Sequence, residues 1–330
     1  MVSYEDRKSH DQVRIKFIRG ATSAPLVPVS STSGGSDAWR QVDFLNPADT
    51  NLMVVAGVSE HPTGNINEHQ FWYHEVALVL DGEMLAQDMD TGAVYRAREG
   101  DLFYWAPGLR LRFGGAFRLY FVKTPVPIRW TKTPRGKKRT ELLHLKGEYV
   151  YPGTPPDELR REKISQKDHP VQPKIKFIRG ALQTNSLMVT EMPASGVVQE
   201  SADFEGSIVN PIDSNLVLET STGEHHSNEP GYCDHKWHQM VLILDGEMVN
   251  EDLDTGAIYR GHKGDFIYFG PGLWHTVRGE FRVLATKAPP PRRYVRTATG
   301  VSKLYMSRLQ NETLFPGTPP DYIQKKPIAL

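Results

Sequence analysis

Short apolar runs bounded by turn residues recur along the whole chain. Residues 75–106, EVALVLDGEMLAQDMDTGAVYRAREGDLFYWA, show the pattern, since runs rich in Val, Leu and aromatic residues alternate with Asp and Gly. Such runs predict strands, and MDTG (89–92) and LDTG (253–256) predict the turns between them. Only residues 156–164 hint at a helical period. The pattern therefore predicts an all-β chain folded as sandwiches or barrels.

The chain repeats itself. IKFIRGA occurs at 15–21 and again at 175–181. Four later pairs share one offset of 164 residues (46 to 210): NPADTNL with NPIDSNL, LDGEM with LDGEM, DTGAVYR with DTGAIYR, and PGTPPD with PGTPPD. A length of 330 residues fits two domains of about 150 residues each. We therefore predict a duplicated domain, with halves at 1–165 and 166–330.

Charge and cysteine content narrow the functional classes. Lys plus Arg and Asp plus Glu are 39 each, so no global field favours nucleic acid or an anionic membrane as a partner. Cys233 is the single cysteine, which excludes an intrachain disulfide and suits a reducing compartment. The first residues are polar, and no apolar run approaches the roughly 18 residues of a membrane span. We expect a cytoplasmic protein with a small-molecule partner.

Two stretches of the second half carry candidate chemistry. YCDHKWHQMVLILDGEM (232–248) is followed by GDFIYFGPGLWHTV (264–277). A strand with alternating polar residues, then a Gly, then Gly-Asp leading to Pro-Gly-x-x-His resembles the paired motifs of the cupin superfamily. Two copies make the chain similar to a bicupin, loosely of the ethanolamine-utilisation or ureidoglycine-aminohydrolase type. The resemblance implies two tandem cupin barrels, that is, double-stranded β-helices or jelly rolls.

The resemblance also implies metal-ligand positions. In the second half these positions hold Cys233, His235, Gln239 and His275, so Gln replaces the usual Glu. The first half has His69, Phe71, Glu75 and Leu111 at the matching positions, two of them apolar. We therefore expect the N-terminal domain to be structural, with a degenerate site, and the C-terminal domain to hold the metal and the active site.

Strand periodicity supports part of this assignment. Residues 233, 235, 237 and 239 share parity, so their side chains point to one face of a strand, where His275 from a neighbouring strand could join them. Two imidazoles with an amide oxygen suit Fe(II), Mn(II), Ni(II) or Zn(II), and family analogy favours Fe(II). The competing interpretation is that His235 is a hydrogen-bonded core residue, Gln239 a buried amide and Cys233 a small hydrophobe.

Other residues complete the predicted site. We expect an aromatic wall for a small organic ligand and two groups that could move a proton. The wall is predicted from Trp237, Phe266 and Trp274, with His226 on the rim; the proton-transfer candidates are His238 and Tyr268. His238 has the opposite parity to His235, so it should face away from the lumen unless a bulge shifts the register.

The sequence thus leaves several functions open. A metal-dependent cupin enzyme acting on a small organic substrate in the C-terminal barrel leads, with a dioxygenase favoured by family analogy. A hydrolase, isomerase or lyase with Mn(II), Ni(II) or Zn(II) is the alternative within the enzyme class. A non-catalytic bicupin that binds a small molecule is the alternative outside it. Exposed strand edges favour a homo-oligomer.

Overall fold

The computed structural model describes most of both halves of the chain. It describes residues 13–28, 39–45, 50, 53–62, 65–124, 129–133, 136–140, 174–183, 187–191, 199–209, 214, 217–235, 237–288, 294–297, 300–303, 322–323 and 326–327. Apart from two short 3₁₀ helices, η1 (Ala21–Ser23) and η2 (Ala181–Gln183), the regular structure of these residues is β-strand. The all-β prediction is confirmed.

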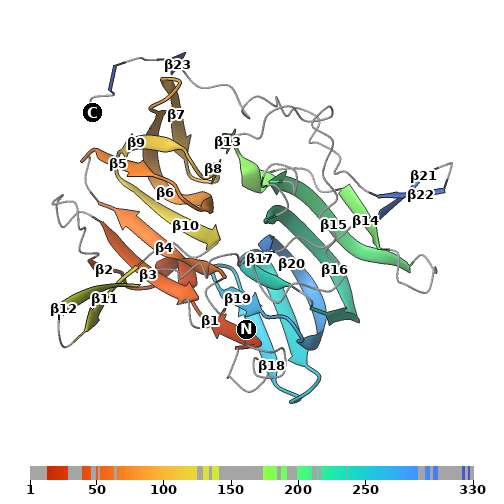
Figure 1. Cartoon of the computed structure of the whole chain (residues 1–330). Coiled ribbons are helices and arrows are strands. Elements are labelled where there is room, and N and C mark those ends of the chain that lie inside the picture. Colours follow the sequence, from red (N-terminus) through yellow and green to blue (C-terminus); the bar gives the residue numbers. More distant parts are fainter. Residues whose placement is uncertain are drawn as a thin grey trace, which may run out of the picture.

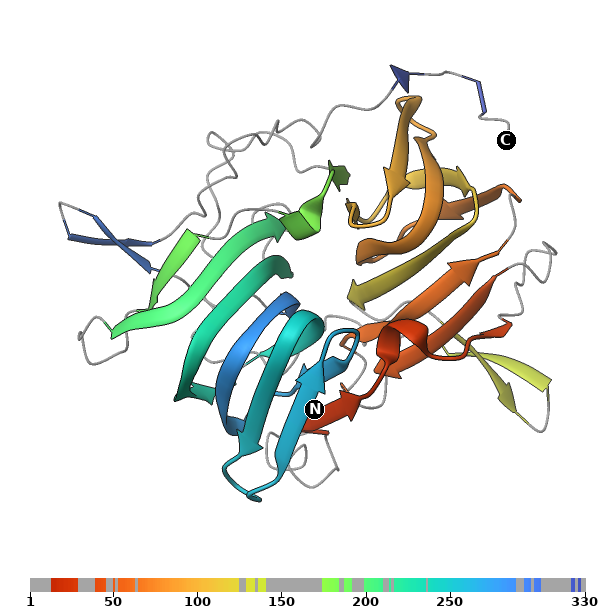
Figure 2. The same cartoon turned by 180° about the vertical axis from the view of Figure 1, so that it is seen from behind.

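Each half contributes one large, curled antiparallel sheet (Figures 1 and 2). The strands drawn from the N-terminal half are β2 (Val27–Pro28), β3 (Arg40–Leu45), β4 (Val55–His61), β5 (Asn67–Gln70), β6 (His74–Asp88), β7 (Ala93–Arg98), β8 (Leu102–Trp105), β9 (Arg110–Gly114) and β10 (Phe117–Thr124). Those from the C-terminal half are β14 (Leu187–Glu191), β15 (Gln199–Val209), β16 (Glu219–Asp234), β17 (His238–Asp252), β18 (Ile258–His262), β19 (Phe266–Phe269) and β20 (Trp274–Ala288).

Smaller elements complete the set. The hairpins β11 (Arg129–Thr133) with β12 (Gly136–Thr140) and β21 (Tyr294–Thr297) with β22 (Gly300–Lys303) stand apart from the large sheets, and β23 (Tyr322–Ile323) pairs with β7.

The two copies of IKFIRG are exchanged between the halves. β1 (Ile15–Ile18) pairs antiparallel with β19, so the start of the chain completes the C-terminal sheet. β13 (Ile175–Ile178) pairs in the same register with β8 of the N-terminal half. In Figure 1, the red β1 accordingly lies beside the blue β19. The predicted boundary near 165 lies outside the described residues, but each barrel contains a strand from the other half.

A buried aspartate holds each exchanged strand in place. Asp265 accepts hydrogen bonds from the backbone N–H of Gly20 (2.7 Å) and of His262 (2.9 Å). Asp101 does the same for Gly180 (2.7 Å) and Arg98 (2.9 Å) in the other half. The Gly-Asp turn of the repeat therefore anchors the Arg-Gly turn that follows each exchanged strand.

The shared sequence LDGEM marks a bend of the long central strand. Gly82 and Gly246 have positive φ angles of 80° and 76°. A Cβ at these positions would lie 2.1 Å from the Ala116 carbonyl oxygen and 2.0 Å from that of Glu280. Only glycine permits this approach, which explains why the motif occurs in both copies.

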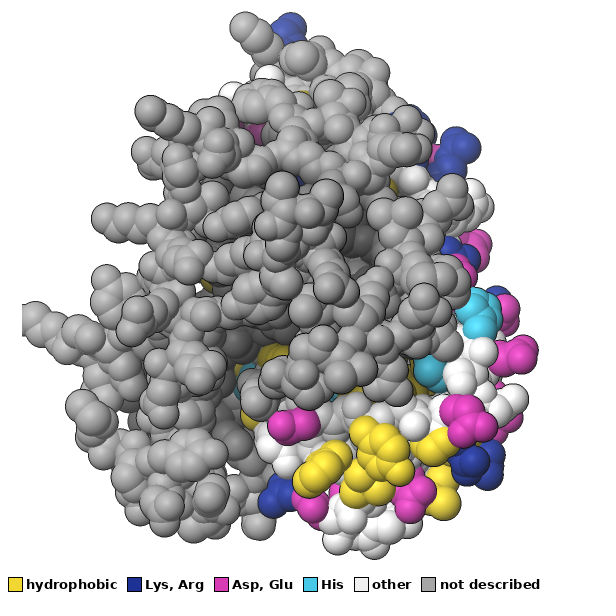
Figure 3. Space-filling model, turned by 90° about the vertical axis from the view of Figure 1, so that its right-hand side faces the viewer, with side chains coloured by type: hydrophobic (Ala, Val, Ile, Leu, Met, Phe, Trp, Pro, Cys, Tyr) yellow, Lys and Arg dark blue, Asp and Glu magenta, His cyan; other side chains and the backbone are white. Residues whose placement is uncertain are grey.

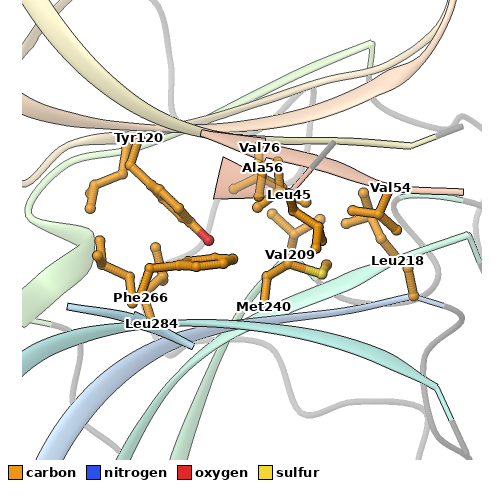
Figure 4. Packing of buried hydrophobic residues seen from close by; sticks show 14 of the residues in the cluster. Leu45, Val54, Ala56, Val76, Tyr120, Val209, Leu218, Met240, Phe266 and Leu284 are labelled. Atoms are coloured by element: carbon orange, nitrogen blue, oxygen red, sulfur yellow. The ribbon is translucent and has the colours of Figure 1, made fainter. Parts of the chain in front are cut away.

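An apolar core joins the two halves. Leu45, Val54 and Tyr120 of the N-terminal half face Met240 and Phe266 of the C-terminal half in one continuous cluster (Figure 4). All five side chains are fully buried and belong to one cluster, so the two halves share this core. Each half also has a core of its own: Phe71, Phe103 and their neighbours in the first, Val241, Phe269 and theirs in the second.

The possible helical period at 156–164 lies outside the residues that the structure describes. Within the described residues, no helix is long and apolar enough to cross a membrane.

Candidate functional site

Two histidines distant in the sequence meet inside the C-terminal half. The Nε2 atoms of His235 and His275 lie 2.7 Å apart, and both residues are buried. The ring of Phe269 stacks on both imidazoles, at centroid distances of 5.1 and 4.5 Å. Backbone hydrogen bonds from His235 N–H to the Leu273 carbonyl and from Gly272 N–H to the His235 carbonyl tie the two segments together. The Pro-Gly turn therefore positions the pair, as the motif predicted.

Both imidazoles are neutral at physiological pH. Burial lowers the pKa of His275 from 6.5 to about 4. Burial and the adjacent His275 lower the pKa of His235 well below its ordinary value. In the neutral pair, one Nε2–H donates to the other Nε2. The neutral ring is also the form that binds a metal ion.

The other two predicted ligand positions are less engaged. Cys233 is directly opposite His275 in the register of β16 and β20 and is half-buried. The amide oxygen of Gln239 accepts a hydrogen bond from Trp237 Nε1 (3.2 Å). Among the described residues, no group of three His, Cys, Asp or Glu side chains could hold a metal ion. The donors that could hold a divalent ion are therefore the two imidazoles. The prediction that residues 233–239 form one strand is corrected, because β16 ends at Asp234, His235 follows it outside a strand, and Gln239 belongs to β17.

The residues expected around the histidines are divided. The Trp237 ring meets His235 edge-on, at 5.6 Å. Trp274 is 56% exposed, so the outer half of the predicted aromatic wall faces solvent instead. His226 is also exposed, with its Nε2 3.6 Å from a Glu224 carboxylate oxygen. On the side of the molecule shown in Figure 3, histidine side chains indeed lie next to acidic ones.

Phe266, Tyr268 and His238 belong to the other face of the sheet. Phe266 and Tyr268 are part of the core between the halves, whereas Ile267 and Phe269 pack in the core of the C-terminal half. His238 Nδ1 is hydrogen-bonded to the Tyr268 hydroxyl (2.7 Å), as its parity predicted. The prediction that Phe266 and Tyr268 line the site is therefore corrected, because successive residues of β19 alternate between the two faces.

A buried ion pair that the sequence did not reveal lies on the lumen face. Lys287 Nζ is 3.5 Å from a Glu219 carboxylate oxygen, and their side chains are only 12% and 2% exposed. Lys287 is flanked by Glu219 of β16 on one side and by Gln239 of β17 on the other. The carboxylate missing from the motif position in β17 is thus present two strands away, on the far side of β20.

Comparisons with known proteins place this arrangement. No family model and no curated protein matches the sequence. Among solved structures, the putative glyoxylate induced protein from Pseudomonas aeruginosa is 12% identical with a TM-score of 0.54, covering 86% of this chain and 92% of that one. The protein Ylba from E. coli is 12% identical (TM-score 0.51, 87% and 97% covered). Salicylate 1,2-dioxygenase from Pseudaminobacter salicylatoxidans is 13% identical (TM-score 0.51, 78% of each chain).

The chain shares the two-barrel fold of these structures, which is the fold that the resemblance of its motifs implied. At this level of identity the likeness concerns the fold alone.

The N-terminal barrel has a different lumen. Phe71 and Leu111 occupy the positions of the two histidines and are buried in an aromatic core. Glu75, at the motif carboxylate position, lies 3.8 Å from Lys123. Burial raises the pKa of Glu75 from 4.5 to about 7, against the opposing effect of the Lys123 ammonium. His69 is hydrogen-bonded to Tyr73 (2.9 Å). The two polar residues at the motif positions of this half, Glu75 and His69, thus both interact with neighbouring protein side chains.

Sequence reasoning missed two further residues of the C-terminal lumen. Asn250 is fully buried in β17, beside the half-buried Glu251. His225 is only 6% exposed and stacks on Phe281 (5.1 Å). A comparison of the two copies contained a signal for Asn250, because its counterpart 164 residues earlier is Ala86.

Proposed function

We propose that the C-terminal barrel is the active site of a metal-dependent enzyme that acts on a small organic substrate. The observation that carries the proposal is the convergence of the Nε2 atoms of His235 and His275 at 2.7 Å, in neutral form and inside a core. The matching positions of the N-terminal barrel are apolar, so one site per chain is expected.

The protein residues have separable roles in this proposal. His235 and His275 would hold a divalent ion, with the Gln239 amide oxygen as a third, neutral donor. When bound, the metal would supply Lewis-acid chemistry at a substrate carbonyl or carboxylate. Phe269 fixes both imidazole planes and keeps bulk water from that side. Trp237 holds the Gln239 oxygen by its hydrogen bond.

Within this class we propose a dioxygenase that uses Fe(II). The support is the resemblance of the motifs and the shared fold of the salicylate 1,2-dioxygenase, both of which concern architecture. A hydrolase, isomerase or lyase that uses Mn(II), Ni(II) or Zn(II) would place the same residues around the same ion.

A second candidate is a non-catalytic bicupin that binds a small molecule without metal. It is favoured by Gln239, which replaces a carboxylate, and by the lack of a three-ligand group among the described residues. In that case the two imidazoles would serve as a hydrogen-bonding pair for the ligand.

Metal analysis separates the two candidates. The purified protein is incubated in turn with Fe(II), Mn(II), Ni(II) and Zn(II), passed through a desalting column and measured by elemental analysis. We expect about one equivalent of metal in the wild type and almost none in His235→Ala/His275→Ala. The matched control is His69→Ala/His74→Ala, which removes two imidazoles from the N-terminal half and should keep the metal. A wild type that retains none of the four metals would refute the enzyme proposal and support the second candidate.

A further inference from the structure

Asn250 is a buried amide without a partner. Its side chain is 0% exposed, and neither its amide oxygen nor its amide nitrogen has a hydrogen-bond partner within the described part of the chain. Buried polar side chains in folded proteins nearly always have one, and leaving such a group unpaired destabilises the fold. Asn250 therefore needs an explanation other than stability.

The amide faces the lumen of the C-terminal barrel. Asn250 lies directly opposite Val277 of β20, which packs against the core of that half. The preceding residue, Val249, is opposite Arg278, and both line a groove on the outer surface. Since directly paired residues share a face and successive residues alternate, Asn250 points inward.

Asn250 is also close to the histidine pair. Asp252, two residues further along β17, is directly opposite His275. Asn250 is thus the diagonal neighbour of His275 on the same face, a relation that places Cβ atoms about 7 Å apart in antiparallel sheets. A single small ligand can span that distance.

The other barrel shows the same position filled for packing. Ala86 is fully buried between Tyr95 and Phe113, the residues paired with it on the adjacent strands. In the C-terminal barrel Phe113 is replaced by the smaller Val277. The polar side chain and the reduced bulk thus occur together, and only in the half that contains the histidine pair.

We propose that Asn250 is a ligand-binding residue of the C-terminal site, which recognises an uncharged group that both donates and accepts a hydrogen bond, a carboxamide being the simplest example. The inference rests on the proposed function only in placing the ligand in the same lumen. An amide matches such a group because it offers a donor and an acceptor side by side. Lys287, on the lumen face of β20, does not call for an anion in this site, because Glu219 already balances its charge.

The first test uses stability. Removing the unpaired amide should remove the destabilisation that its burial causes. Asn250→Leu, of similar volume, is therefore expected to raise the midpoint temperature of thermal unfolding. Asn250→Val is the second variant, in case the leucine does not fit. The matched control is Ala86→Asn, which buries the same amide in the packed N-terminal lumen and should lower the midpoint. A lower midpoint for both Asn250 variants, or failure of both to fold, would show that Asn250 is structural and overturn the proposal.

The second test uses small probes. The wild-type protein, labelled with ¹⁵N at asparagine, is titrated with propanamide, with butanone, which lacks the donor, and with propanoate, which is charged. We expect propanamide to shift the Asn250 side-chain amide signal at least several-fold more than the other two, and not to bind Asn250→Leu. Equal shifts with all three probes, or none with propanamide, would contradict the proposal. Neither test requires metal, so a failure of metal binding would leave the result for Asn250 interpretable on its own.

Discussion

Lys287 should be able to form its buried ion pair with a carboxylate on either neighbouring strand. The reason is that Lys123, its counterpart in the N-terminal half, pairs with a carboxylate on the opposite flank. Lys123 is paired with Glu75 of β6 and has Val55 of β4 on its other flank. Lys287 reverses this order, with Glu219 of β16 and Gln239 of β17.

The corresponding experiment transplants one arrangement into the other barrel. Glu219→Val removes the carboxylate from an ammonium that is 12% exposed, and breaking a buried pair costs about 3–5 kcal/mol. We expect about 3 kcal/mol, the lower end, because this residual exposure lets water reach Lys287. Gln239→Glu alone adds a second carboxylate and should cost about 1 kcal/mol through like-charge repulsion. The double variant restores one carboxylate per lysine and should lie within about 1 kcal/mol of the wild type.

Urea unfolding at pH 8, followed by tryptophan fluorescence, measures the four corners of this cycle. The expected coupling between the two substitutions is then about 3–4 kcal/mol in the stabilising direction. If the double variant is no more stable than Glu219→Val, a carboxylate at position 239 cannot replace the one at position 219, and the reasoning is refuted. The mirror cycle, Val55→Glu with Glu75→Gln, provides the control in the N-terminal half.

Three more outcomes follow from the contacts described. Asp265→Ala should cost about 3 kcal/mol by removing two hydrogen bonds from a carboxylate, and amide exchange at Gly20 should accelerate; unchanged exchange would contradict the anchoring role. Burial lowers the pKa of His238 from 6.5 to about 4, so the unfolded chain binds the extra proton and stability is lost as pH falls from about 6.5 towards 4; His238→Phe should show a shallower loss in thermal unfolding across that range. Leu111→His should add no metal by elemental analysis, because Phe71 still fills the position of the partner imidazole; a second equivalent would show that the N-terminal barrel is only one residue short of a site.

The sequence predicted the parts of the site that depend on local spacing. The Pro-Gly turn before His275 brought its ring to His235, and parity put His238 on the other face. The single strand expected over residues 233–239 is instead two strands, because β16 ends at Asp234 and β17 begins at His238. The faces of Phe266 and Tyr268 could not be assigned in this way. FIYF is apolar throughout, since one face packs in the lumen and the other between the barrels, so it shows no alternation to read.

Other features depend on partners that the local sequence does not name. IKFIRG is identical in both copies, so nothing within it indicates that each copy pairs with the other half. Glu219 stands between the apolar run LVL (216–218) and TST (220–222), and only the tertiary position of Lys287 reveals its role. Asn250 precedes Glu251 and Asp252, so the local sequence did not indicate that its side chain is buried.

The exchange of β1 and β13 has a consequence for the order of synthesis. Ile15 is made 254 residues before its partner Phe269 (269 minus 15). β1 therefore stays without this partner until β19 has been made, whereas β13 is made after β8 and can pair with it as soon as it leaves the ribosome. Translation should thus allow the N-terminal barrel to close before the C-terminal one.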